Sequence, residues 1–183
     1  MEILRPRPGL VIALTGMLAA CAGAETQVRQ ENRPASLQPA SAALRPYPDP
    51  GGFLHCVPFA RTVSGIEIYG DAWTWWEQAR GRYQRGRVPE VGAVLTLKPT
   101  QRMRQGHVAV VVAVQDSRRI LVSHANWGGD GSTRGKIHSR QPVIDVSPGN
   151  DWSEVRLLNT LGSFGAHYPV HGFIYQRPDH PSS

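Results

Sequence analysis

The chain has 183 residues, 40% of them hydrophobic, which is enough to bury the core of one domain of ordinary size. Its 19 glycines and 15 prolines are costly inside helices, so a helical bundle is disfavoured and a loop-rich or sheet-rich domain is favoured. The net charge of +6 is modest, and no run of lysines and arginines is interleaved with aromatic residues, which argues against nucleic-acid binding.

Residues 1–24 are predicted to be an export signal. Arg5 and Arg7 form a short basic region, and the apolar stretch that follows is too short to span a membrane stably. Residues 18–21 resemble the lipobox of bacterial lipoproteins, in which the cysteine, here Cys21, is acylated and anchors the protein. Residues 22–24 offer an ordinary cleavage site as the alternative. The chain is therefore expected in the cell envelope, as a membrane-attached lipoprotein, a periplasmic protein or a secreted one.

Residues 25–52 are predicted to be a linker, because they are rich in Ala, Pro, Ser, Gln and Arg and show no apolar period. The folded domain is expected over residues 53–177, followed by a short tail over 178–183. A helix is predicted over residues 56–64, since Pro58 is tolerated in a first turn and Gly65 is placed to end it. A second helix is predicted from Asp71 to Gly81.

Apolar segments with turn residues between them then predict strands. Residues 116–119 are predicted to connect the second and third of these strands as a hairpin. Helices followed by a meander of strands give an α+β fold, with the N-terminal helices packed on an antiparallel sheet of about six strands. The predicted strands cover residues 93–97, 107–114, 120–126, 142–146, 155–158 and 170–175.

Cys56 is the only cysteine after the predicted signal, in a compartment where structural cysteines normally come in pairs. Taken alone it could be a small buried apolar residue. Its predicted position at the start of a helix points to another role, because the partial positive charge there favours a thiolate nucleophile. The free N–H groups of the same turn could also stabilise an oxyanion.

A cysteine nucleophile needs an imidazole as general base, and His107 opens a long apolar strand directly after Gly106. Strand alternation places His124 and Asn126 on one face of the next strand. A hairpin turn near Asp116 would bring Asn126 level with His107, because the two residues stand at similar sequence distances from the turn. A polar side chain here could orient the imidazole.

Five segments of the chain resemble the CHAP family of cysteine, histidine-dependent amidohydrolases/peptidases. They are LHCVPFAR at 54–61, GDAWTWW at 70–76, PEVGAV at 89–94, GHVAVV at 106–111 and HANW at 124–127. The resemblance implies a papain-like (NlpC/P60-like) domain that hydrolyses an amide bond of peptidoglycan, either next to muramic acid or within the stem peptide and its cross-links. It places the nucleophile at Cys56 and the general base at His107.

The same resemblance leaves two choices for the residue that orients His107. Many members of the family carry Glu-x-Asn on this strand, where this chain has His124 and Asn126. We therefore favour Asn126, with His124 as a second partner. Trp73, Trp127 and Trp152 are candidate contacts for substrate, although aromatic residues at such positions are more often part of a core.

No cofactor or resident metal is expected, since the spacing of His55, Cys56, His107 and His124 fits no standard zinc motif. Two alternative functions stay open. One is a non-catalytic envelope lipoprotein that binds cell wall or a partner through a degenerate hydrolase fold. The other keeps the amidase chemistry and acts on a different amide, because specificity lies in the loops. A regulatory protein partner also stays open, because the sequence does not identify one.

Overall fold

The computed structural model describes residues 44–48, 51–128 and 133–179. The predicted export signal, Cys21 and most of the predicted linker lie outside the described residues. None of the helices in the described part of the chain has the length and apolar character that a membrane crossing needs.

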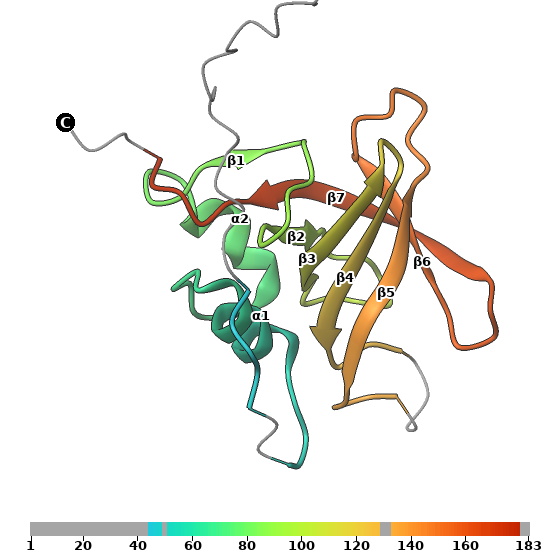
Figure 1. Cartoon of the computed structure of the whole chain (residues 1–183), viewed down its shortest axis with the longest axis horizontal. Coiled ribbons are helices and arrows are strands. Elements are labelled where there is room, and N and C mark those ends of the chain that lie inside the picture. The colour runs from blue at the N-terminus through green and yellow to red at the C-terminus, as the bar shows by residue number, and fades with distance from the viewer. Residues whose placement is uncertain (1–43, 49–50, 129–132, 180–183) are drawn as a thin grey trace, which may run out of the picture. The chain divides into compact units, whose positions relative to one another are not determined.

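Seven antiparallel strands form one sheet in the described residues (Figure 1). The order of neighbours is β1-β7-β2-β3-β4-β5-β6, and β7 also pairs with β6, so the six strands β2 to β7 close into a barrel. The strands are β1 (Arg85–Gly86), β2 (Val94–Leu97), β3 (His107–Asp116), β4 (Arg119–Ala125), β5 (Ile137–Asp145), β6 (Glu154–Leu158) and β7 (Phe164–Ile174).

The predicted strands and their antiparallel arrangement are confirmed, and the hairpin between β3 and β4 turns where expected. Three features differ from the prediction: β1 is an additional short strand, β5 begins at Ile137, and β7 begins at Phe164. The early parts of β5 and β7 were not predicted because residues 137–141 are mostly polar and residues 164–169 are mostly polar or small, so neither forms an apolar run. The domain is therefore richer in sheet than the predicted α+β layout.

Alternating side chains of β3 belong to two separate cores. Ala109 and Val111 pack inside the barrel with residues of the other strands, including Leu95 and Phe173. Val108 and Val110 face the other way and share a core with helical residues such as Phe59. This is the period of two that a strand imposes on its side chains. His107, the first residue of β3, is therefore on the same side of the strand as Ala109 and Val111.

The helix α1 (Cys56–Ser64) has the predicted bounds. Gly65 ends it in the left-handed conformation, with φ 72°, and its N–H donates to Arg61 O at 2.9 Å. Segments N-terminal to the predicted domain also contact α1: Arg45 N–H donates to Val63 O at 3.0 Å, and the ring of Tyr47 lies 4.9 Å from that of Phe59.

The predicted second helix is shorter than expected. It consists of one 3-10 turn, η1 (Ala72–Thr74), and one α-helical turn, α2 (Trp75–Gln78). Beyond Gln78, Arg80 N–H donates to Glu77 O and Arg82 N–H to Ala79 O, so tight turns spanning three residues replace further helix.

Candidate active site

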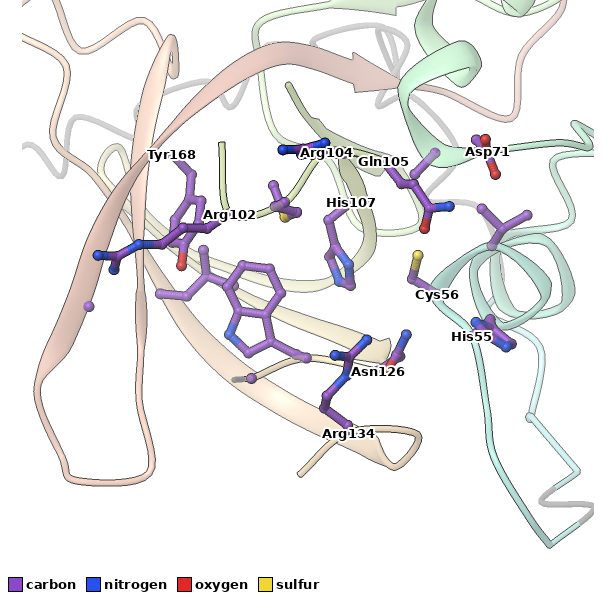
Figure 2. Close-up of a pocket in the computed structure, with 18 of the residues that line it drawn as sticks. His55, Cys56, Asp71, Arg102, Arg104, Gln105, His107, Asn126, Arg134 and Tyr168 are labelled. Atoms are coloured by element: carbon purple, nitrogen blue, oxygen red, sulfur yellow. The ribbon is translucent and has the colours of Figure 1, made fainter. Parts of the chain in front are cut away.

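Cys56 lies in the first turn of α1, on the wall of a cleft of about 1170 Å³ (Figure 2). The first turn of a helix leaves N–H groups without intrahelical partners, and Pro58 has no N–H of its own. The backbone N–H groups of Cys56 and Val57 act on the Cys56 sulfur and lower the pKa of its thiol. The predicted position of the thiol at a helix N-terminus is therefore confirmed.

His107 lies at the start of β3 and lines the same cleft. The backbone N–H of Val108, the next residue, also lowers the pKa of the Cys56 thiol, which places the thiol near the start of β3. Figure 2 shows the imidazole of His107 and the sulfur of Cys56 pointing into the same part of the cleft, which Gln105 also lines. The cysteine and the histidine are thus brought together from two elements that are 51 residues apart in the sequence.

The turn before His107 requires glycine. Gly106 has φ 65°, and a Cβ built on it would lie 2.9 Å from Leu97 O and 3.2 Å from Trp73 N. Trp73 N–H also donates to Gln105 O at 2.9 Å, so the turn is packed tightly against η1. This close approach fixes where β3, and with it His107, begins.

We expect Gly106→Ala to lower the free energy of unfolding by about 2 kcal/mol or more, because a side chain is strained at this φ and meets backbone atoms. Chemical denaturation of purified protein measures the change. The matched control is Gly81→Ala, since Gly81 has φ 71° but a Cβ added to it would meet no atom within 4 Å. A smaller loss in Gly106→Ala than in Gly81→Ala would contradict the expectation.

His124 contacts His107 directly through its side chain. Nε2 of His107 and Nδ1 of His124 are 2.7 Å apart, and the two rings meet edge to face. The pair β3–β4 aligns Val110 with Ser123, so His107 and His124 are diagonal neighbours on one face of the sheet. His124 in turn contacts Gln141 Oε1 through its Nε2 at 2.5 Å. Because Nε2 of His107 is occupied, its Nδ1 is the nitrogen left for a reacting group.

Asn126, which the sequence favoured as the orienting residue, makes a different contact. Its Oδ1 accepts a hydrogen bond from Gly135 N–H at 3.1 Å, and its own N–H donates to Lys136 O. The backbone of Asn126 has φ 60°, so the strand conformation ends here and the side chain leaves the alternation of β4. Asn126 lines the cleft, but it holds the segment that leads to β5.

Residues 47–126 match the CHAP domain. That segment runs from Tyr47 to Asn126 and includes Cys56, His107 and His124. This part of the chain is a CHAP domain. The resemblance found in the sequence is therefore confirmed. CHAP domains are typically cysteine- and histidine-dependent amidohydrolases or peptidases. No curated protein matches the chain.

Burial controls the protonation of the three central groups of this CHAP domain. Burial lowers the pKa of His107 well below 6.5, and the neighbouring His124 and His138 lower it further. Burial also lowers the pKa of His124 to about 3, although its hydrogen bond to Gln141 acts in the opposite direction. The pKa of the Cys56 thiol is raised by burial, although backbone N–H groups near the sulfur, that of Val108 first, act in the opposite direction. The resting pair is therefore a neutral thiol beside a neutral imidazole.

We expect the acidic limb of the kcat/KM profile to have its midpoint below pH 6.5. A general base works only when unprotonated, and the lowered pKa of His107 keeps it unprotonated in mildly acidic solution, where a histidine of ordinary pKa would be mostly charged. Initial rates on a soluble substrate across the acidic range measure the midpoint. A midpoint at or above 6.5 would show that burial does not govern His107.

The three tryptophans predicted as substrate contacts have different surroundings in the structure. Trp127 lines the cleft, with its ring 4.7 Å from His107 and 5.1 Å from Tyr168. Trp73 is half-exposed on η1 and is absent from the cleft wall. Trp152 is only 3% exposed and packs against Phe173 in the barrel core, so its prediction as a substrate contact is wrong.

Sequence reasoning missed several residues of the cleft wall. Arg102, Arg104 and Arg134 line it, against one carboxylate, Asp71. None of the three arginines forms an ion pair with a described residue. They are exposed, Arg102 and Arg104 lie in one loop and Arg134 lies 30 residues later, so no continuous charge run signalled them. In the part of the chain that the structure describes, no three His, Cys, Asp or Glu side chains are arranged to hold a metal ion.

Proposed function

We propose that this protein hydrolyses an amide bond of peptidoglycan, with Cys56 as nucleophile and His107 as general base. The observation that carries the proposal is the position of the Cys56 thiol, at a helix N-terminus and beside a buried histidine in one cleft of a CHAP domain. A papain-like arrangement, in which the helix presents the cysteine and the sheet presents the histidine, agrees with this geometry.

In the first half of the reaction, the Cys56 sulfur attacks the carbonyl carbon of the amide while His107 Nδ1 takes the thiol proton. The negative charge that develops on the carbonyl oxygen is stabilised by N–H donors near the sulfur, of which the first turn of α1 supplies Cys56 and Val57. The C–N bond then breaks, His107 returns the proton to the leaving amine, and a thioester on Cys56 remains.

In the second half, a water molecule attacks the thioester carbonyl and gives a proton to His107. Collapse of this intermediate breaks the C–S bond and releases the new carboxylic acid, and the proton on His107 returns to the sulfur. The neutral resting pair is restored. No oxidant, reductant or metal ion is needed for either half.

The charge of the cleft wall supports an anionic peptide as substrate. Arg102, Arg104 and Arg134 outnumber Asp71 there, and arginine pairs well with carboxylates. The stem peptides of peptidoglycan carry free carboxylates along a short chain. Trp127 and Tyr168, with rings 5.1 Å apart, add an aromatic surface at the same wall, which suits a sugar ring.

We also propose that the protein acts in the cell envelope, on the strength of the predicted export signal and of Cys21. Peptidoglycan lies outside the cytoplasmic membrane, so the two proposals agree. A protein that is anchored by a lipid on Cys21 would act on cell wall close to the membrane.

Digestion of purified sacculi tests the proposed activity. The wild-type protein is expected to release soluble fragments, and protein pretreated with iodoacetamide, which blocks the thiol, is expected to release none. Mass analysis identifies the bond: free L-alanine N-termini indicate cleavage next to muramic acid, and new termini at D-amino acids indicate cleavage within the peptide. Equal, background release by treated and untreated protein would overturn the proposal.

A further inference from the structure

Gln141 on β5 connects the two histidines to the backbone. Its Nε2 donates to Leu158 O at 2.5 Å, and its Oε1 lies 2.5 Å from His124 Nε2. His124 Nδ1 then meets His107 Nε2 at 2.7 Å. A continuous chain of hydrogen bonds therefore runs from the backbone of β6 to the proposed general base.

An irregularity in β5 brings Gln141 to this position. The pair β4–β5 aligns His124 with His138 and Val122 with Gln141, so β5 has one extra residue between these two pairs. His138 and Gln141 are three residues apart and would face opposite sides of a regular strand. The bulge, in which Arg140 has φ 53° and donates its N–H to Ser123 Oγ at 3.1 Å, puts both on the face that carries His124.

The chain of hydrogen bonds has a direction, because Leu158 O can only accept. The Gln141 atom that faces it must be the NH2 group, so the Gln141 oxygen faces His124. His124 must then carry its proton on Nε2, which leaves Nδ1 as an acceptor. His107 must therefore donate from Nε2, and its Nδ1 has a free lone pair.

The opposite arrangement would leave two buried acceptors facing each other. If His124 carried its proton on Nδ1, its Nε2 lone pair would face the Gln141 oxygen. Turning the Gln141 amide over would only move the conflict to Leu158 O. His124 is fully buried, so water cannot relieve either conflict.

We propose that Gln141 is a positioning residue for this reaction: anchored on Leu158 O, it fixes the tautomer of His124 and thereby that of His107. The result is a His107 whose Nδ1 is ready to take the Cys56 proton. In the opposite tautomer, Nδ1 would already carry a proton and could not act as the base. The inference rests on the proposed function for its catalytic meaning, but the tautomers themselves can be observed without substrate.

Two-bond 1H–15N correlation spectra of histidine-labelled protein test the assignment, because they distinguish a proton on Nδ1 from one on Nε2. His107→Gln and His124→Gln variants identify the signals. Near neutral pH, both His107 and His124 of the wild type are expected to carry their protons on Nε2. A wild-type His124 or His107 with its proton on Nδ1 would overturn the inference, and this result needs no variant of Gln141.

The second readout is the variant Gln141→Leu, which has a similar volume and no hydrogen-bonding group. His124 is expected to populate both tautomers, and kcat to fall about tenfold to a hundredfold with little change in KM. Gln176→Leu, at a partly buried glutamine outside the cleft, is the matched control and should change neither tautomer nor kcat. Wild-type tautomers in Gln141→Leu, with or without a lower kcat, would overturn the inference.

The two proposals fail separately. Protein that shows the expected tautomers and cleaves no peptidoglycan would leave the positioning role intact and defeat the proposed substrate. Protein that cleaves peptidoglycan with His124 protonated on Nδ1 would confirm the hydrolase and defeat the role of Gln141.

Discussion

Cys56→Ala is expected to lower kcat on soluble peptidoglycan fragments by about 10⁴-fold or more, leaving no release of sacculus fragments above background. The reason is that the side chain supplies the bond-forming atom, and no other cysteine lies among the described residues. Fragment release followed by mass analysis measures the loss. Since Cys56 is only partly buried and forms no disulfide, the fold should persist, and an unchanged thermal transition checks this.

Replacing both proposed catalytic residues should lower turnover little more than replacing one of them. A base without its nucleophile has no proton to take, so Cys56→Ala together with His107→Ala is expected to match Cys56→Ala alone. His167→Ala is the matched histidine control, since His167 is an exposed residue of β7 outside the cleft, and it should keep wild-type turnover. Turnover in Cys56→Ala close to that of the wild type would reject the cysteine mechanism and favour a non-catalytic binding protein.

Much of the sheet could be predicted because its strands are short apolar runs. The run from His107 to Val114 is long enough to identify a buried strand, and the polar residues 116–119 identify its turn. The early part of β7 could not be predicted in the same way. Its residues 164–169 are mostly polar or small, and they are held in the sheet by pairing with β6, the pairing that closes the barrel. Such pairing between distant segments leaves no local pattern.

The positions of Cys56 and His107 were predictable because each depends on a local signal. Pro58 and Gly65 mark the ends of α1, and Gly106 marks the turn before β3. Which residue contacts His107 depends on the backbone conformation at the end of β4. Alternation places His124 and Asn126 on one face, but the left-handed backbone of Asn126 ends that alternation, and only the contact of His124 with His107 is present.

Gln141 was missed for a related reason. The predicted strand began at Pro142, and a bulge residue such as Arg140 has no sequence signature when it is not glycine. The chemistry of the site therefore depends on an irregularity that periodicity cannot reveal.

His124 and Asn126 are expected to affect different properties when they are replaced. His124→Phe keeps an aromatic ring but loses both hydrogen bonds, so His107 is no longer held in one tautomer and kcat should fall about 10³-fold with KM nearly unchanged. Asn126→Ala removes the acceptor for Gly135 N–H, so we expect it to lower the free energy of unfolding by about 1–2 kcal/mol. We expect Asn126→Ala to lower kcat far less than His124→Phe does.

Two further variants separate the contributions of Asn126. Asn126→Asp keeps an oxygen for Gly135 N–H, and Asn126→Gly keeps the freedom to adopt φ 60° but has no acceptor. If Asn126→Asp is about as stable as the wild type and Asn126→Gly is less stable, the loss of stability in Asn126→Ala comes from the missing hydrogen bond to Gly135 N–H. Initial rates and denaturation curves on the same preparations give both quantities. If Asn126→Ala lowered kcat more than His124→Phe, the orienting role would belong to Asn126, and the contact between the two histidines would serve the packing of the barrel end.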